Sequence, residues 1–295
     1  MSEQIPLSDA ASASDPAQDD HGPAREVAAS VAYQRLLMVN VVFVGEVGAG
    51  DRQWVLVDAG LLGAASSIKR AAAQRFGEGS RPAAIVLTHG HFDHVGALET
   101  LAEEWDVPVY AHPLEAPYLD GRSSYPPGDP SVGGGLMAAL ARFYPRGPID
   151  ISRRLRSLSE TGDVLELPGW RWIHTPGHSV GHVSLWREAD RTLIAGDAFV
   201  TTGQESAYAV ATQRAEMHGP PAYYTIDWAA AEASVKLLAD LEPEVVATGH
   251  GEPMRGPEMR SALRQLADRF AEIAVPETGR YLREPATVGN GLAYR

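Results

Sequence analysis

The sequence contains no cysteine, and this absence removes two kinds of chemistry at once. Without thiols the chain can form neither disulfides nor thiolate metal ligands. It also has no apolar run near the roughly 20 residues that a bilayer-spanning helix needs. The first thirty residues lack the basic start and the apolar stretch of a signal peptide. We therefore expect a soluble, cytoplasmic protein that does not act at a membrane.

Basic residues are scarce relative to acidic ones. The 295 residues include 25 Lys and Arg against 38 Asp and Glu, which gives a formal net charge of −13 at pH 7. Such a surface repels phosphate backbones unless it carries a local basic stripe. The densest basic cluster, RRLR at residues 153–156, is short and is typical of a solvated surface segment. We expect no nucleic-acid partner.

Strands and helices alternate in the first half of the chain. The strands are predicted by β-branched and apolar runs at residues 35–46, 54–60, 83–87 and 108–112. A helix is predicted at residues 65–76 by composition and by the closing Gly77, and an amphipathic helix at residues 96–105. Regularity is then lost in a proline-rich insertion, residues 113–148, which contains one expected short helix at 134–145.

The second half repeats this order of strands and helices. Its first strands are spaced as in an antiparallel meander and are expected at residues 164–168, 170–175, 182–186 and 192–197. A helix at 227–241 with Asp227 as N-cap, a strand at 245–251 and a helix at 257–273 complete the chain. The repeat predicts one α/β domain of two similar sheets packed face to face, with helices outside. Its expected limits are residues 31–275, between a disordered N-terminal tail at 1–30 and a C-terminal tail at 276–295.

The stretch THGHFDHVG at residues 88–96 carries the clearest chemical signal. His89, His91, Asp93 and His94 directly follow a predicted strand. Imidazole and carboxylate are ligand types suited to Zn, Fe or Mn. In an extended backbone His89 and His91 point to one side, whereas Asp93 and His94 lie where the next helix begins. One loop can therefore supply two residues to each of two metal ions. A polar turn with incidental histidines is the alternative, but ten histidines in the chain make three within six positions improbable by chance.

Four ligands leave two metal ions under-coordinated, so other strand ends must contribute. Three further residues lie where a predicted strand meets a glycine-bounded turn: His178, Asp197 and His250. A carboxylate such as Asp197 can bridge two cations, which a single imidazole does not readily do. Two metals about 3.5–4 Å apart with such a bridge form a hydrolytic arrangement.

This ordered set of seven residues resembles the metallo-β-lactamase-fold hydrolase superfamily, in its glyoxalase-II-like and lactonase-like branch, over roughly residues 35–270. The resemblance implies a four-layer αββα sandwich of two mixed β-sheets flanked by helices, with the site at one edge of the sheets. β-Lactamases of this fold commonly carry another residue in place of Asp197, so antibiotic hydrolysis is disfavoured.

The resemblance also assigns roles to individual residues. The first metal would be held by His89, His91 and His178. The second metal would be held by Asp93, His94 and His250. Asp197 would bridge the ions, and Asp58 in VLVDAG matches an acid that lies behind the ligands. The implied cofactors are two divalent ions, Zn in the first place, with Fe or Mn as alternatives.

Hydrolysis is the reaction that these residues predict. A hydroxide shared by two metals forms at neutral pH and attacks a polarised carbonyl. Asp93 is the expected catalytic residue, which orients the hydroxide and passes a proton to the leaving group. The expected substrate is a small acyl compound, a lactone, ester or thioester. A phosphodiesterase of the same fold is one alternative. Another resembles persulfide dioxygenases, with a single iron on His89, His178 and Asp197. A non-catalytic binding protein is disfavoured, because such proteins tend to lose ligands.

Apolar and tyrosine side chains predict where the substrate is held. Phe143 and Met137 in the insertion are expected to cap an acyl chain, and Tyr223 or Tyr224 to place a hydroxyl near the substrate carbonyl. The alternative is that these residues only pack the insertion and loop onto the sandwich. A homodimer is compatible with the fold, although no residue argues for it. The remaining histidines are not expected to be ligands: His21, His112, His174, His182 and His218.

Overall fold

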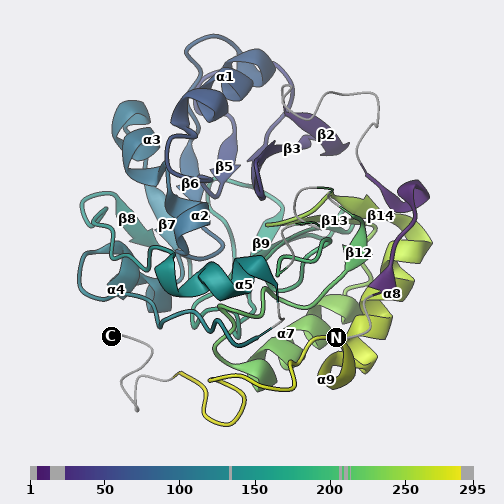
Figure 1. Ribbon diagram of the computed structural model, residues 1–295. Coiled ribbons are helices and arrows are strands. Elements are labelled where there is room, and N and C mark those ends of the chain that lie inside the picture. Colours follow the sequence, from purple (N-terminus) through teal and green to yellow (C-terminus); the bar gives the residue numbers. More distant parts are fainter. Residues whose placement is uncertain are drawn as a thin grey trace.

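Two β-sheets lie at the centre of the computed structural model (Figure 1), which describes residues 5–13, 24–132, 135–205, 208, 212 and 214–286. Within these residues the larger sheet has seven strands in the order β2-β3-β4-β5-β6-β7-β8. They span Arg25–Ala28, Val31–Leu36, Val39–Val44, Val55–Val57, Ala84–Val86, Val109–Ala111 and Leu155–Ser157. The smaller sheet has five strands in the order β14-β13-β11-β10-β9. In chain order, β9, β10, β11, β13 and β14 span Trp170–His174, Val183–Arg187, Thr192–Gly196, Val245–Thr248 and Met254–Arg255.

Helices cover the outer faces of both sheets (Figure 1). The larger sheet is covered by α1 (Ala65–Phe76) and α3 (Leu98–Trp105), the smaller by α7 (Trp228–Asp240) and α8 (Gly256–Asp268). Short helical turns are α2 (Phe92–Val95), α4 (Ala116–Leu119), α5 (Leu136–Leu140), α9 (Phe270–Ile273), η1 (Asp9–Ala11), η2 (Pro113–Glu115) and η3 (Ala141–Phe143). Among the described residues no helix combines the length and the apolar character needed to cross a bilayer.

Alternation along the strands creates the layers. Val55 and Val57 of β5 are buried between the two sheets together with Leu185 of β10. Leu56, between them in sequence, faces the other way and packs with Ile68 of α1. Because successive strand side chains point to opposite faces, one strand serves two cores. A third core joins the smaller sheet to α7 and α8. The expected αββα sandwich of two mixed sheets is confirmed.

The expected strand at 35–46 is a hairpin instead. β3 ends at Leu36 and β4 begins at Val39, and these two residues lie opposite each other in an antiparallel pair. Leu37 in the turn has φ of +62° and is exposed. The prediction was wrong because the two-residue turn, Leu37 and Met38, contains none of the Gly, Asn or Asp residues that usually mark such turns.

The expected strand at 164–168 is also wrong, because this segment forms turns. Val164 and Leu167 are both buried between the sheets, and the Leu167 N–H donates to the Val164 carbonyl at 2.9 Å. A spacing of three between buried residues fits a turn and not the period of two of a strand. The other expected elements coincide with observed ones. β10 and α8 each extend one residue beyond the expected range, and the last expected helix is divided into α8 and α9.

The described parts of the N-terminal segment do not form the disordered tail that we expected at 1–30. In residues 5–13, β1 (Ile5–Pro6) pairs with β12 (Glu216–Met217). In residues 24–30, β2 joins the edge of the larger sheet. Leu7 and Val27 are buried, so a few apolar side chains dock a mostly polar segment.

The described part of the C-terminal segment, residues 276–286, also packs on the domain. Tyr281 is buried and its hydroxyl donates to the Pro127 carbonyl at 2.9 Å. The segment therefore contacts the insertion. The remaining parts of the two expected tails, and His21 with them, lie outside the described residues: 1–4, 14–23 and 287–295.

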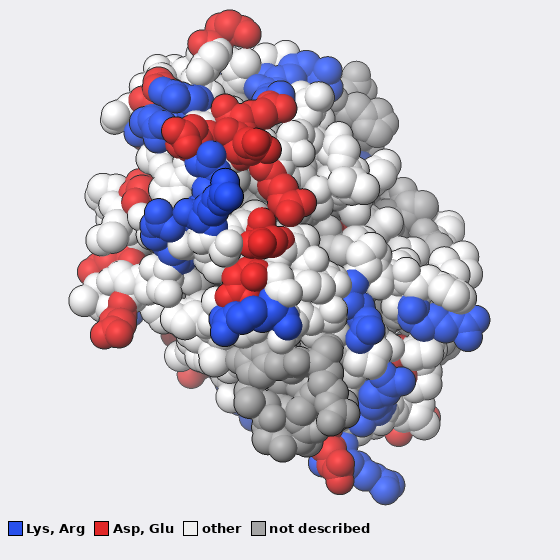
Figure 2. Space-filling model, turned by 90° about the vertical axis from the view of Figure 1, so that its left-hand side faces the viewer, with Lys and Arg blue, Asp and Glu red and all other residues white. Residues whose placement is uncertain are grey.

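Charged side chains of both signs share the surface. Figure 2 shows basic and acidic residues side by side on the face that forms the left-hand side of Figure 1. The RRLR cluster runs into the exposed edge strand β8, and Arg154 pairs with Asp106 at 2.6 Å. The cluster is thus a surface segment, as its composition predicts.

Candidate metal centre

The seven predicted ligands lie together at one edge of the two sheets. In the smaller sheet β11 runs parallel to β13, and β9 and β11 both run antiparallel to β10, so β9, β11 and β13 end at the same edge. Loops that follow the carboxyl ends of such strands meet there. The loop after β6 reaches this edge from the larger sheet. Each of the seven residues exposes at most 6% of its surface: His89, His91, Asp93, His94, His178, Asp197 and His250.

Local backbone geometry separates the four ligands of the first motif. His91 is extended, with φ of −65° and ψ of 153°, and α2 begins at the next residue. His89 and His91 therefore belong to an extended arm, whereas Asp93 and His94 lie in the first turn of α2. This is the division that the spacing in the sequence predicts.

The ligand atoms form groups small enough to hold an ion. In the first group, atoms of His89, His91 and His178 lie within 4.8 Å of one another. In the second group, atoms of Asp93, His94 and His250 do the same. Asp197 lies between the groups. Its Oδ2 is 3.5 Å from His178 Nε2, 3.5 Å from His94 Nε2 and 3.1 Å from His250 Nε2.

Asp58 holds a histidine of each group in one tautomer. Its Oδ2 lies 2.8 Å from His94 Nδ1, which must carry the proton because a carboxylate only accepts. The Thr88 hydroxyl donates to the same oxygen at 2.8 Å and lies 3.1 Å from His89 Nδ1. The Nε2 atoms of His89 and His94 are buried and have no hydrogen-bond partner in the described part of the chain. Histidines held in this way fit metal ligation.

His250 is held by the hairpin turn that the sequence did not reveal. Its Nδ1 lies 2.6 Å from the carbonyl oxygen of Met38, so Nδ1 donates and Nε2 is free to accept. Met38 is 212 residues away in the chain. No feature of the sequence marks this carbonyl as part of the site.

His91 and His178 face each other across the first group. His91 Nδ1 lies 3.0 Å from His178 Nε2, a distance at which one cation can replace a shared proton. His178 Nδ1 lies 3.4 Å from the Thr225 hydroxyl, which itself donates to the Pro221 carbonyl at 2.9 Å. The threonine therefore orients His178 with Nε2 toward His91.

Burial makes three imidazoles neutral. It lowers the pKa of His89 and of His91 well below the usual value, and the neighbouring histidines lower both further. Burial likewise lowers the pKa of His178 to about 4. At neutral pH the first group thus offers lone pairs and not protons, as metal ligands must.

Carboxylates dominate the second group. Burial opposes protonation of His94, but the charges of Asp197, Asp58 and Asp93 outweigh it and raise the His94 pKa well above its usual value. Burial also opposes ionisation of Asp197, but His250 and His94 lower the Asp197 pKa well below its usual value. The buried negative charge demands a cation beside it. The donor set therefore fits divalent metal ions.

Asp197 is fixed by its surroundings. Its N–H donates to His182 Nε2 at 2.9 Å, and His182 Nδ1 is held by the Thr175 hydroxyl at 2.8 Å. A side chain at Gly249 would place its Cβ 2.0 Å from Asp197 Oδ1, so the backbone must pass here without one. His182 thus positions Asp197 by accepting from the Asp197 backbone N–H. Both nitrogens of His182 are engaged in hydrogen bonds, which agrees with the expectation that it is not a metal ligand.

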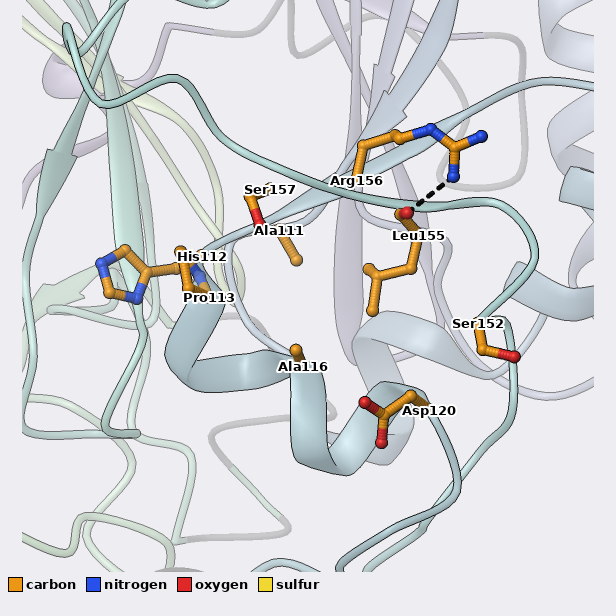
Figure 3. Close-up of a pocket in the computed structure, with 9 residues that line it drawn as sticks. All are labelled: Ala111, His112, Pro113, Ala116, Asp120, Ser152, Leu155, Arg156 and Ser157. Carbon is orange, nitrogen blue, oxygen red and sulfur yellow. Dashed lines mark hydrogen bonds between the residues drawn. The ribbon is translucent and has the colours of Figure 1, made fainter.

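The other described histidines lie outside the two ligand groups. His112 caps η2 by accepting from the Leu114 N–H at 3.2 Å, and its ring stacks on His174 at 4.3 Å. His112 also borders a cavity of about 190 Å³ beside η2, α4 and β8 (Figure 3). His218 Nδ1 donates to the Gly219 carbonyl at 3.1 Å, and its Nε2 lies 3.5 Å from Glu205 Oε2.

Of the predicted substrate residues, Tyr224 lies nearest to the ligands. Its ring stacks on His91, with centroids 4.5 Å apart at 27°. Its hydroxyl is buried and makes no hydrogen bond within the described residues. The ring of Tyr223 lies 5.1 Å from that of Tyr224 and is also buried.

The two predicted residues of the insertion lie farther out. Met137 is partly buried, and its sulfur accepts from the Tyr144 hydroxyl at 3.7 Å. Tyr144 in turn packs on Phe92, with ring centroids 5.3 Å apart. Phe143 is 69% exposed. The insertion thus contacts the ligand loop through Tyr144 and presents Phe143 to solvent.

Sequence reasoning missed the contacts that Glu115 and Tyr125, two buried residues of the insertion, make with the ligand loops. Glu115 accepts hydrogen bonds from Gly90 and Ser179, which neighbour predicted ligands in the chain. The only signal in the sequence is an acid shortly after a proline, which by itself predicts a helix start. The contacts become visible only in the folded chain.

The chain belongs to the metallo-beta-lactamase superfamily, whose family model matches residues 35–250. It is 47% identical over 252 residues to the probable metallo-hydrolase YflN of Bacillus subtilis, which covers 85% of this chain and 95% of that protein. It is 33% identical over 237 residues to the uncharacterized protein YobT of the same species, covering 79% and 92%.

Solved structures show the same fold. TTHA1623 in a di-iron-bound form is 30% identical, with a TM-score of 0.50, and the match covers 76% of this chain and 92% of that one. A B3 metallo-beta-lactamase with an active-site glutamic acid has a TM-score of 0.57 at 20% identity, covering 85% and 90%. The predicted family is confirmed. Family, relatives and the His/Asp cluster together support a metal-dependent hydrolase that uses divalent ions.

Proposed function

We propose that the chain is a dinuclear hydrolase that cleaves the acyl bond of a lactone, ester or thioester. The observation that carries this proposal is the position of Asp197, whose Oδ2 faces His178 of the first group at 3.5 Å and His250 of the second at 3.1 Å. Together with the shared carboxylate, each group would offer one ion four protein ligands. When bound, two such ions activate water at neutral pH and polarise a carbonyl oxygen.

Asp93 is the group proposed to handle the proton. Its carboxylate belongs to the second group, with Oδ2 3.5 Å from His250 Nε2, and it is the most exposed of the seven ligands at 6%. A carboxylate in this place orients the attacking water and accepts its proton. As the acyl bond breaks, the proton passes to the departing alkoxide or thiolate, so the products are an acid and an alcohol or thiol.

Tyr224 is proposed to bind the substrate carbonyl oxygen. Burial, with a smaller contribution from the nearby Asp93 charge, raises the Tyr224 pKa far above its usual value, so the hydroxyl stays protonated and donates. The ring is fixed by stacking on His91. A fixed donor that has no partner among the described residues can stabilise the negative charge that develops on a carbonyl oxygen under attack.

An apolar tail on the substrate is supported by the side chains beyond Tyr224. Phe92 and Tyr144 pack together next to it, and Leu140 and Phe143 of the insertion are exposed farther out. This sequence of rings and aliphatic groups suits an acyl chain. One guanidinium, that of Arg142, lies 4.6 Å from the centre of the Phe143 ring, so the substrate panel below includes a phosphodiester. The insertion is therefore proposed to border the acyl pocket.

The test combines metal analysis with a substrate panel. We expect about two divalent ions per chain and hydrolysis of lactones, thioesters or esters, faster for octanoyl than for acetyl compounds. Iron is supported by similarity to TTHA1623, and zinc by the ligand types. One iron per chain with oxygen uptake on a persulfide would overturn the proposal, and so would a preference for bis-nitrophenyl phosphate over every acyl substrate.

A further inference from the structure

A fully buried carboxylate at the end of η2 joins two loops of the metal centre. Glu115 Oε2 accepts from the Gly90 N–H at 3.0 Å and from the Tyr125 hydroxyl. Glu115 Oε1 accepts from the Ser179 hydroxyl and from the Gly181 N–H, both at 2.8 Å. Four donors thus converge on the two oxygens of one side chain.

Each oxygen serves a different ligand loop. Gly90 lies between His89 and His91, so Oε2 holds the arm that carries two ligands of the first group. Ser179 follows His178, so Oε1 holds the loop that carries the third ligand. The carboxylate therefore sets the distance between the two arms that must converge on one ion.

Only a carboxylate satisfies this arrangement. Its two oxygens both accept and neither donates, whereas an amide would turn an N–H₂ group toward one pair of donors. The surroundings of Glu115 are also tightly packed, since a Cβ at Gly90 would lie 2.5 Å from the Tyr125 hydroxyl oxygen. Tyr125 itself packs on His91, with ring centroids 4.5 Å apart. These contacts leave the arm of His89 and His91 no room to shift toward Glu115.

We propose that Glu115 is a positioning residue for the first group, which fixes the arm of His89 and His91 against the loop of His178 before a metal binds. This inference rests on the proposed function, because positioning matters only if the first group holds an ion. It gives the insertion a second role. Its first turn supports the metal centre, while its later part borders the proposed acyl pocket.

The test is metal affinity in Glu115→Gln, measured by competition with a chromogenic chelator on the purified chain. We expect one of two ions to bind about 10–100-fold more weakly and the other to be unchanged. Cobalt substitution provides a spectroscopic readout, because a shifted arm changes the ligand field of only one site. Circular dichroism and the melting temperature of the metal-free protein show whether the variant folds.

Asp129→Asn is the matched control. Asp129 is a buried carboxylate of the insertion, 4% exposed, that accepts from Ser131 and Arg280 and contacts neither ligand loop. We expect it to lower the melting temperature and to leave both metal affinities unchanged. Should Glu115→Gln not fold, Ser179→Ala removes one donor to Oε1 and is expected to weaken one ion about threefold.

The outcomes separate this inference from the proposed function. A wild-type chain that binds no metal overturns the proposed function. If the wild type binds two ions and Glu115→Gln binds both as tightly, the positioning role is wrong and the proposed function stands. Equal losses in Glu115→Gln and Asp129→Asn would also overturn the positioning role, since they would reflect general destabilisation.

Discussion

The two ligand groups are supported by different parts of the molecule. The second group is held by the sandwich itself, with His94 fixed by Asp58 after β5 and His250 by the carbonyl of Met38 between β3 and β4. The first group contacts Thr88 and Thr225, and it is held in addition from the insertion, through the carboxylate of Glu115. One group thus depends on the strands that define the fold, and the other also depends on a segment that is irregular in sequence.

This difference predicts unequal affinities for the two proposed ions. Changes in the insertion alter the support of one group and leave the strand ends intact. Asp58 and Asp197 couple the groups, because Asp58 reaches His89 through Thr88 and Asp197 faces both. Variants of residues that contact both groups should therefore weaken the binding of both ions. Variants of residues that contact only one group should weaken only one ion.

The largest effect is expected for Asp197→Ala. Loss of the shared carboxylate removes a ligand from both groups, so we expect both ions to be lost on dialysis and turnover to fall below detection. Elemental analysis and an acyl-hydrolysis assay measure the two. Asp190→Ala, at the other end of β11 and paired with Arg187, is the control and should retain both ions. Normal metal content in Asp197→Ala would refute the proposal that Asp197 is a ligand shared by the two groups.

Asp58→Asn should come next in size. An amide nitrogen facing His94 or Thr88 breaks the chain of donors, so we expect both ions to bind about 10–100-fold more weakly. Thr88→Val keeps the bond between Asp58 and His94 but cuts the link to His89, and it should weaken only one ion. Chelator competition on both variants checks this. Identical metal affinities in Asp58→Asn and Thr88→Val would refute the division into residues that support both groups and residues that support one.

The ligands could be predicted from the sequence, but most of their supports could not. The seven predicted ligands can be recognised in the sequence because four lie within six positions and three follow strands at glycine-bounded turns. The αββα layers follow from apolar alternation in the strands. These signals are local, so they can be recognised in the sequence without knowledge of the fold.

The supports are contacts between distant segments. Glu115 and Gly90 are 25 residues apart, and Met38 and His250 are 212 apart. The Met38 carbonyl is a backbone group that any residue would supply, and its hairpin lacks turn-forming residues. Asp58 was found only because it belongs to a recognisable family motif. Geometry that is set by tertiary packing leaves no period or spacing in the sequence.

Tyr224→Phe should separate catalysis from metal binding. The hydroxyl has no partner in the described structure, so its removal should not alter the fold or either ion. If it donates to the carbonyl oxygen in the transition state, kcat should fall about 100-fold with little change in KM. Tyr144→Phe loses only a contact to the Met137 sulfur and serves as control. An unchanged kcat in Tyr224→Phe would show that the Tyr224 hydroxyl does not donate to the substrate carbonyl oxygen in the transition state.

The smallest effect is expected for Phe143→Ala, which tests the outer part of the insertion. Phe143 is 69% exposed, so truncation should change neither the melting temperature nor the metal content. If the ring covers the distal end of an acyl chain, KM for an octanoyl substrate should rise about threefold while KM for an acetyl substrate stays the same. Leu165→Ala, at an equally exposed residue in the turn after β8, should change neither value. A rise for both chain lengths would place Phe143 near the reacting carbonyl, and no rise for either would confine the insertion to its support of the first group.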